Sequence, residues 1–224
     1  MGAAANNRLL FSIDKEIAFP ASEAGKVWRV YIVSGTLCLG DSIRITAARL
    51  KGKPRSELCD VMAEVKAIHE ELDATEEMRE AGAAAKGSIV GLDIKNCYCG
   101  RRRVPKKEIS FTKQSIGLSS GEPFEELDTF TVRFSSPEEA IGAVKVGRNA
   151  ILLWFGKSVS GKVVEIFDSL EGMRVCLLFG KRLAIPSDSA LRTEVVRCTK
   201  VFVDYKGKVC YINAFLEFEE GGDD

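Results

Sequence analysis

The chain has 224 residues, enough for one large domain or two small ones with hydrophobic cores of their own. Hydrophobic residues make up 46% of it and charged residues 29%, which is typical of a soluble globular protein and excludes a disordered chain. The 32 Lys and Arg residues balance the 32 Asp and Glu residues, so nucleic-acid binding would have to come from a local patch.

The sequence favours a cytoplasmic protein with no membrane partner. Its longest apolar run, Ala150–Phe155, is too short to cross a bilayer, and no charged segment followed by an apolar one begins the chain. The seven cysteines are odd in number and scattered, whereas a secreted disulfide framework has an even, clustered set. We therefore expect a reducing compartment.

The number and spacing of the cysteines and histidines give little support for metal binding or catalysis. Only Cys97 and Cys99 lie close together in the sequence, and His69 is the single histidine. A tetrahedral zinc site would need distant cysteines, so we interpret the cysteines as buried or half-buried thiols. One histidine also leaves no Ser-His-Asp set and no histidine pair for a metal. We expect no cofactor, no metal and no catalytic residue.

The first half of the chain reads as a series of strands. Short segments of β-branched and aromatic residues alternate with Gly, Pro and Asp turns, a spacing that predicts an antiparallel all-β barrel or sandwich. Alternating strands and helices would be spaced differently. The strands are expected at Arg8–Ile13, Val27–Val33, Ser42–Ala47, Val61–Ile68 and Ser88–Ile94.

Ile68–Ala85 does not follow this pattern. It is rich in Glu, Met and Ala and carries six carboxylates between His69 and Glu80, with few apolar anchors. Helix propensity alone would allow a helix. We interpret it as a solvated acidic loop or one short helix between two strands, since acid–base catalysis would require a buried, shaped pocket.

Ser119–Pro123 has the composition of a linker, and a second series of strands follows it. Up to Pro123 the chain holds 19 basic and 16 acidic residues, a net charge of +3, and the remainder has a net charge of −3. We therefore predict two domains, residues 8–121 and 124–219. Strands of the second are expected at Leu127–Phe134, Ala150–Phe155, Gly161–Phe167, Met173–Phe179, Glu194–Val203 and Lys208–Glu217.

Gly156–Val163 nearly matches the phosphate-binding loop G-x-x-x-x-G-K-[ST], with Lys162 as its lysine. However, Val163 replaces the magnesium-binding Ser or Thr, and a strand-like segment follows where phosphate binding needs a helix N-terminus. A hairpin turn explains the same residues. Gly35–Ser42 has similar spacing, but Asp41 stands in place of the lysine and would repel phosphate.

Two basic clusters in the first half are candidates for binding nucleic acid. One surrounds Gly52 and Pro54, and the other is a run of five cations in seven residues. The positive charges within such a cluster repel one another unless water or an anionic partner surrounds them. RNA phosphate is a suitable anionic partner. Tyr98 could stack on a base or fill a core. The candidate residues are Arg101, Arg102, Arg103, Lys106, Lys107, Lys51 and Lys53.

Gly25–Ile43 carries the pattern G-x-V-x-x-x-x-I-x-x-G-x-L-x-x-G-D-x-I. It resembles the start of domain II in translational GTPases of the elongation factor Tu class, including the selenocysteine-specific factors. Phe11–Asp14, Val61–Ile68 and Ala81–Leu92 extend the resemblance, and residues 124–219 resemble domain III more weakly. Gly25, Gly35 and Gly40 are expected to turn the chain, with Asp41 capping the last turn. Val27, Ile32, Leu37 and Ile43 are expected to fill the barrel.

The resemblance implies two consecutive antiparallel β-barrels, the first contacting the tRNA acceptor end and small-subunit RNA and the second supporting the tRNA stem. The GTPase domain itself is missing: no true phosphate loop, no D-x-x-G switch and no N-K-x-D motif appears where the family has them. We therefore expect a non-catalytic module that binds tRNA or the ribosome, with a GTPase domain in cis or in trans.

Two other classes of function stay open. A protein–protein adaptor could dock a separate GTPase or another partner, using the acidic segment 69–80. An enzyme could use the Lys162 loop on a nucleotide.

Overall fold

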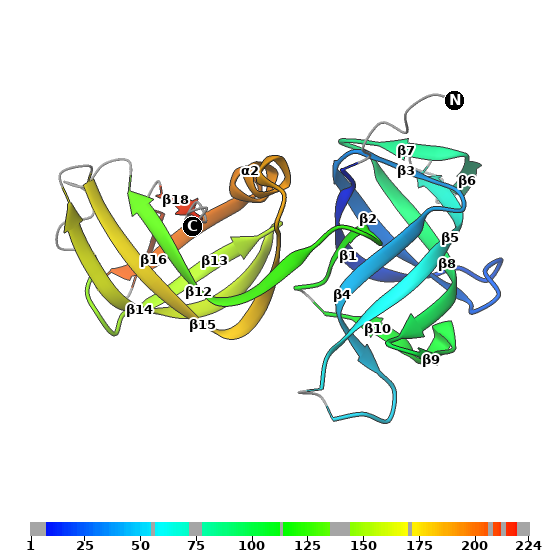
Figure 1. Ribbon diagram of the computed structural model, residues 1–224, viewed down its shortest axis with the longest axis horizontal. Coiled ribbons are helices and arrows are strands. Elements are labelled where there is room, and N and C mark those ends of the chain that lie inside the picture. The colour runs from blue at the N-terminus through cyan, green and yellow to red at the C-terminus, as the bar shows by residue number, and fades with distance from the viewer. Residues whose placement is uncertain are drawn as a thin grey trace. The chain divides into compact units, whose positions relative to one another are not determined.

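The computed structural model of the chain describes residues 8–54, 57–71, 78–112, 114–134, 144–169, 172–205, 208–211 and 214–218. The chain divides into two compact units, Met1–Pro123 and Phe124–Asp224, each built from antiparallel strands (Figure 1). The predicted all-β fold class is therefore confirmed. Within the described ranges, no helix is both long and apolar enough to cross a membrane.

The first unit is a closed six-stranded antiparallel barrel. Its strands follow the order β4-β11-β1-β2-β8-β5, and β5 pairs with β4 to complete the ring. β10, β6 and β9 extend the pairing of β4, β5 and β8, while β3 and β7 form a separate ribbon. The elements are β1 (Leu10–Ala18), β2 (Lys26–Ser34), β3 (Thr36–Cys38), β4 (Ser42–Leu50), β5 (Cys59–Glu71), β6 (Met78–Ala81), β7 (Ala83–Ala85), β8 (Ile89–Cys99), β9 (Arg102–Arg103), the 3-10 helix η1 (Lys106–Glu108), β10 (Ile109–Phe111) and β11 (Ile116–Ser119).

The glycine and aspartate of the Gly25–Ile43 pattern make the turns expected of them. Gly35 has a φ of 75° and Gly40 a φ of 80°, in the left-handed region that favours glycine. The Asp41 carboxylate accepts a hydrogen bond of 2.8 Å from the backbone N–H of Cys38, which caps this turn between β3 and β4. The pattern therefore encodes backbone geometry.

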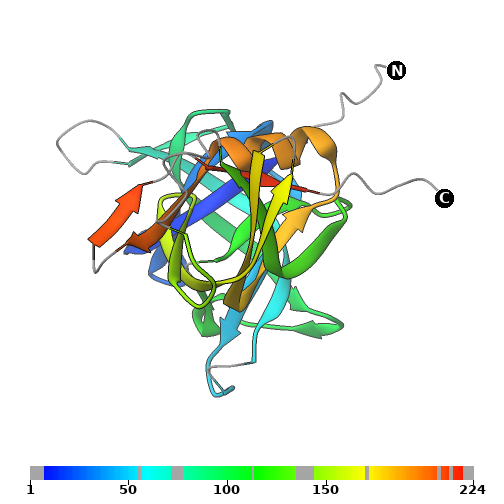
Figure 2. The same cartoon turned by 90° about the vertical axis from the view of Figure 1, so that its left-hand side faces the viewer.

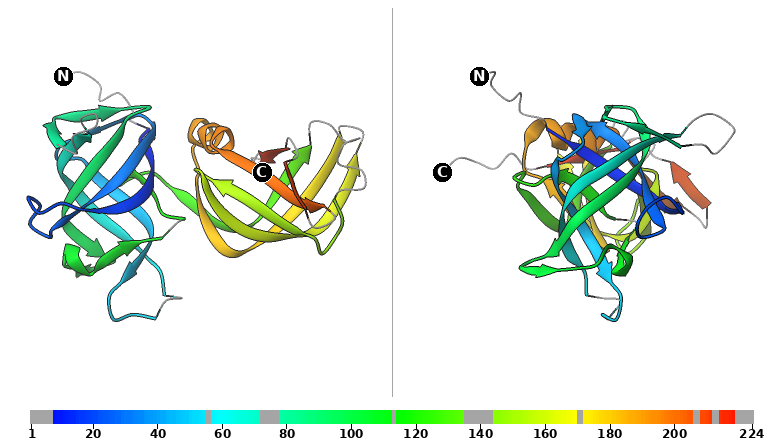
Figure 3. Two further views of the ribbon diagram at one scale, coloured as in Figure 1. Left: turned by 180° about the vertical axis from the view of Figure 1, so that it is seen from behind. Right: turned by 90° about the vertical axis from the view of Figure 1, so that its right-hand side faces the viewer.

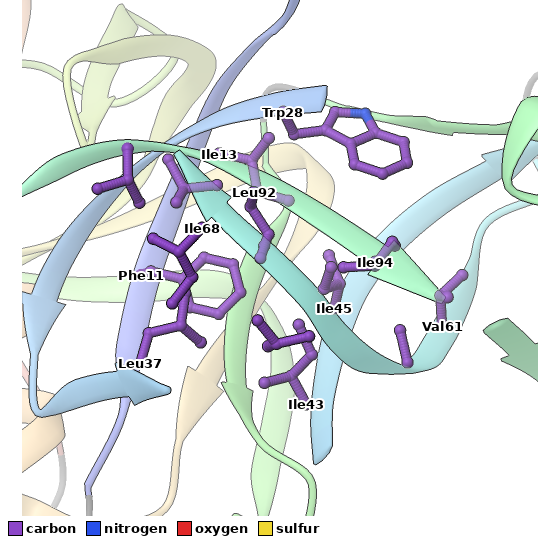
Figure 4. Packing of buried hydrophobic residues seen from close by; sticks show 14 of the residues in the cluster. Phe11, Ile13, Trp28, Leu37, Ile43, Ile45, Val61, Ile68, Leu92 and Ile94 are labelled. Carbon is purple, nitrogen blue, oxygen red and sulfur yellow. The ribbon is translucent and has the colours of Figure 1, made fainter. Parts of the chain in front are cut away.

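Three apolar residues of the same pattern, Ile32, Leu37 and Ile43, fill the barrel as predicted, whereas Val27 is buried but does not belong to the barrel's core cluster. Val27, Ile32, Leu37 and Ile43 are completely buried. Figure 4 shows side chains from several strands converging on one cluster, with Phe11 near its middle and Trp28 at its margin. Burial of these side chains supplies the main driving force for closing the barrel.

The described parts of Ile68–Ala85 are strands, which corrects the expected loop or helix. β5 continues to Glu71 and pairs with β6, with Ile68 opposite Ala81 and Glu70 opposite Arg79. Ile68 is fully buried, so strand pairing and barrel packing outweigh the helix propensity of the acidic residues. Residues 72–77 lie outside the described residues.

The second unit is a curled sheet of seven strands, a half-barrel, in the order β17-β16-β13-β14-β15-β12-β18 (Figure 2). Trp154 and Phe179 are buried in its interior, and one helix packs against its strands. The view from behind in Figure 3 shows the helix above the curled strands. The elements are β12 (Phe124–Phe134), β13 (Asn149–Trp154), β14 (Lys157–Ser169), β15 (Gly172–Pro186), α2 (Ser189–Arg197), β16 (Thr199–Tyr205), β17 (Lys208–Tyr211) and β18 (Ala214–Glu217).

Two predicted strands of this unit were wrong in extent. Glu194–Val203 begins in α2, where Asp188 caps the helix by accepting a 3.0 Å hydrogen bond from the Leu191 N–H. The β-branched residues of this segment favour a strand on propensity alone, and the cap overrides them. The expected strand Lys208–Glu217 is two strands, β17 and β18, at the two ends of the sheet order.

The segment resembling a phosphate-binding loop is a hairpin. Trp154 pairs with Lys157, and Phe155 and Gly156 between them have φ angles of 47° and 79°, as in a two-residue type I′ turn. Lys162 lies exposed within β14, with no helix N-terminus following it. The hairpin interpretation is therefore confirmed.

A glycine beneath an aromatic ring provides a test of barrel packing. Gly117 in β11 lies directly opposite Phe11 in β1, and a Cβ on Gly117 would fall 1.8 Å from the Phe11 ring. We expect Gly117→Ala to lower the free energy of unfolding by about 1–3 kcal/mol, because the buried ring must move. Urea unfolding measures it. Gly82→Ala is the control, since nothing lies within 4 Å of its Cβ, and equal stability of the two variants would contradict this packing.

Candidate nucleic-acid interface

The two basic clusters, about fifty residues apart in the sequence, come together at one end of the barrel. The backbone N–H of Lys51 donates a 2.8 Å hydrogen bond to the carbonyl of Glu108 in η1. In addition, β10 pairs with the end of β4, with Ile109 opposite Leu50. Figures 1 and 3 show the loop after β4 and the β8–β9 hairpin at the same end, away from β3 and β7. The clusters therefore form one surface.

A tight hairpin presents the three arginines. β8 and β9 pair with Cys99 opposite Arg102 and Tyr98 opposite Arg103, so Gly100 and Arg101 alone form the turn. Gly100 has a φ of 58°, and the favoured two-residue hairpin turns require such a positive φ at their first residue. Arg101, Arg102 and Arg103 are all exposed.

Most cations at this end have no carboxylate partner. Within the described residues, no acidic side chain lies within salt-bridge distance of five of them, in contrast to Lys66, which pairs with Glu23 at 3.1 Å, and Lys95, which pairs with Glu64 at 2.8 Å. Lys53 pairs with Glu57 at 3.0 Å, but both side chains are exposed and such pairs contribute little. The five unpaired cations are Arg101, Arg102, Arg103, Lys107 and Lys51. We call them the basic surface.

Lys106 does not belong to the basic surface, although it was a candidate from the sequence. Its ammonium group is largely buried, forms an ion pair with the buried carboxylate of Asp93 and donates a 2.8 Å hydrogen bond to the Ser22 hydroxyl. It also lies 5.3 Å from the centre of the Trp28 ring, a cation–π distance. Lys106 therefore anchors η1 to the barrel and is not available to phosphate.

Two hollows border the basic surface. A groove of about 650 Å³ is lined by residues that include Lys95, Arg103 and Lys107, and by Asp93 and Glu23 as its acidic members. A smaller hollow of about 460 Å³ is lined by Lys51, Gly52, Lys107 and Glu108. Lys107 lines both, which places cations around a concave surface.

The cysteines near the arginine hairpin belong to the barrel core, with Cys97 inside it and Cys59 and Cys99 packed against it. Within the described part of the chain, no group of His, Cys, Asp and Glu side chains is arranged to hold a metal ion. Cys97 is buried and Cys99 half-buried, and burial together with the neighbouring Cys99 thiol raises the pKa of Cys59 to about 12. A thiol with so high a pKa is almost never a thiolate, so it is a poor nucleophile.

Sequence reasoning missed Asp93 and Ser22, the partners of Lys106. Both are small polar residues within strand- and loop-like segments. Nothing in the sequence joins them to a lysine at position 106, because that contact depends on how β8 and the loop after β1 meet in the barrel.

The comparisons with known proteins give a match at the level of fold. No family model and no curated protein matches the sequence. Among solved structures, the chain is similar to the Saccharomyces cerevisiae Ski7 GTPase-like domain bound to GTP, and to the same domain bound to GDP and inorganic phosphate. Each has a TM-score of 0.65 and 12% sequence identity, over 96% of this chain and 46% of the Ski7 chain. The chain thus has the fold of one part of a GTPase-like protein and spans slightly less than half of its length.

The pairing of Lys106 with Asp93 can be tested by a double-mutant cycle. Asp93→Asn leaves a buried ammonium group without its carboxylate, and we expect a loss of about 3–5 kcal/mol of unfolding free energy. Lys106→Met leaves a buried carboxylate and should also destabilise. The double variant should lose less than the sum of the two single variants. Additive losses in urea unfolding would show that the two groups do not interact.

Because the His69 side chain is buried, we expect the stability of the protein to depend on pH. The Nδ1 atom of His69 has no hydrogen-bond partner among the described residues, and its ring centre lies 4.6 Å from that of Phe19. Burial lowers the pKa of His69 below its ordinary value. The unfolded chain therefore binds a proton more readily, so this contribution to stability is complete above about pH 6.5 and is lost as the pH falls below it. Thermal unfolding between pH 7.5 and 5.5 measures this. His69→Phe should flatten the profile, and an unchanged profile would rule out His69 as its source.

Proposed function

We propose that the chain is a non-catalytic, translation-factor-like module that binds RNA, either tRNA or ribosomal RNA, through the basic surface of its first unit. The observation that carries this proposal is a set of five cations, gathered from two distant segments, that have no carboxylate partner among the described residues. On a protein surface whose charges serve only solubility, positive and negative side chains are interspersed. Five like charges at one end of a barrel repel one another, and an anionic partner relieves that repulsion.

The fold and the sequence pattern support a link to translation. The Gly25–Ile43 pattern resembles domain II of elongation factor Tu-class GTPases, and the chain has the fold of part of the Ski7 GTPase-like domain. In this proposal a GTPase domain, in cis or in trans, supplies the nucleotide-dependent step. The first unit of the chain supplies the binding surface for RNA.

The proposed mechanism is electrostatic. Arg101, Arg102 and Arg103 on the hairpin and Lys51 and Lys107 beside it neutralise backbone phosphates and release condensed counterions. Such contacts fix the position of the RNA without reading its sequence. Catalysis is not part of this role, which agrees with the hairpin geometry around Lys162.

Neutralising the basic surface tests the proposal. A variant with Gln at positions 51, 101, 102, 103 and 107 should bind tRNA and ribosomal particles at least about tenfold more weakly at low salt. The slope of log affinity against log salt should flatten by up to about 3.5, since each lost phosphate contact on single-stranded RNA accounts for about 0.7. Binding titrations at several salt concentrations measure both quantities.

The matched control removes the same charge elsewhere. Gln at positions 145, 162, 181, 182 and 200 replaces five exposed cations of the second unit and should leave the affinity nearly unchanged. If the first variant binds as the parent protein does, the proposal is wrong. The protein–protein adaptor then becomes the better hypothesis, with its expected contact at 69–80, of which residues 72–77 lie outside the described residues.

A further inference from the structure

We propose, building on the proposed function, that Tyr98 is a base-stacking residue and that the basic surface therefore takes single-stranded RNA in preference to duplex. The juxtaposition that carries this inference is an exposed aromatic ring in the same cross-strand row as one of the unpaired arginines. A cluster of cations alone binds any polyanion, whereas a ring beside it adds affinity only for exposed base faces.

The strand register places Tyr98 on the outer face of the barrel end. In β8 the neighbouring Cys97 side chain is buried, and Tyr98 is 40% exposed. Tyr98 lies opposite Arg103 in β9 on one side and opposite Met62 in β5 on the other. Side chains directly opposite one another on antiparallel strands have Cβ atoms about 4.5–5.5 Å apart. The guanidinium group of Arg103 therefore lies within reach of a phosphate next to a base on the Tyr98 ring.

The ring is available for contact. Among the described residues, Tyr98 has no aromatic or cation–π partner, whereas the rings of Trp28, Phe111, Phe130 and Phe179 all pack against other rings. An exposed tyrosine that fills no core and contacts no other ring has an accessible face. A base stacked on that face would cover apolar surface that water now covers.

Duplex RNA cannot use this feature, because its bases are already stacked on their neighbours within the helix. Single-stranded segments present unstacked bases that aromatic side chains bind, and flanking cations hold their phosphates. The position of Tyr98, at the base of the arginine hairpin, matches that arrangement.

The chain offers a matched control in Tyr31. Tyr31 is 38% exposed, lies opposite Ile89 on the outer face of β2, and belongs to neither basic cluster. Tyr98→Leu removes the ring and keeps an apolar side chain, Tyr98→Phe keeps the ring, and Tyr31→Leu removes an equally exposed ring elsewhere.

The experiment measures binding of three probes to the full chain: a single-stranded oligouridine 12-mer, the same strand annealed to its complement, and polyphosphate, which has no bases. The parent protein should bind the single strand more tightly than the duplex. Tyr98→Leu should weaken oligouridine binding by about fivefold to a hundredfold, with the salt slope and polyphosphate binding unchanged. Tyr98→Phe and Tyr31→Leu should bind as the parent does. Polyphosphate binding by Tyr98→Leu shows that the surface is intact.

The outcomes separate this inference from the function on which it rests. If the five-cation variant loses binding but Tyr98→Leu does not, or if duplex binds as tightly as the single strand, the stacking inference is overturned and RNA binding stands. If neither RNA probe binds the parent protein, or if the five-cation variant binds both as the parent does, the proposed function fails and the inference fails with it.

Discussion

The pairing of β5 back onto β4 is the constraint on which the first unit depends. Without it the six strands would form an open sheet, with edges free to pair with other chains. With it, apolar side chains of β1, β2, β4, β5 and β8 face one interior, and the loops are distributed between two ends. The loop after β4, the β8–β9 hairpin and η1 then share an end because their strands are joined around the ring. The collection of cations there is a consequence of closure.

Charge at this end is used in two different ways. Lys106 and Lys107 are adjacent in the sequence, yet one is buried against Asp93 and the Trp28 ring and the other is exposed. Burying an ammonium group is costly unless a carboxylate and hydrogen-bond acceptors compensate it, and Lys106 has both. The buried lysine holds η1 in place, which fixes the position from which Lys107 and the segment before it project.

Much of the fold followed from local sequence. Gly35, Gly40 and Asp41 specify their turn through backbone conformation and a single hydrogen bond, and the apolar pattern around them specifies which side chains lie inside. The helix α2 was not predicted because β-branched residues obscure it, while its cap depends on one aspartate. At the site, the exposed arginines follow from composition. The separation of Lys106 from its neighbours and the approach of Lys51 to η1 depend on contacts between distant strands, which no local pattern contains.

The glycine beneath Phe11 has a counterpart in the second unit. There Gly161 lies opposite Phe179, and a Cβ on Gly161 would fall 2.5 Å from that ring. In each unit the ring fills the space that the glycine leaves empty, so the two residues together form a single packed shape. Among homologues, a larger residue at position 117 should therefore co-occur with a smaller one at position 11. At position 161 a smaller residue at 179 would not suffice, because a Cβ there would also fall 2.8 Å from the Leu178 carbonyl oxygen. Packing thus constrains residues together that lie far apart along the chain.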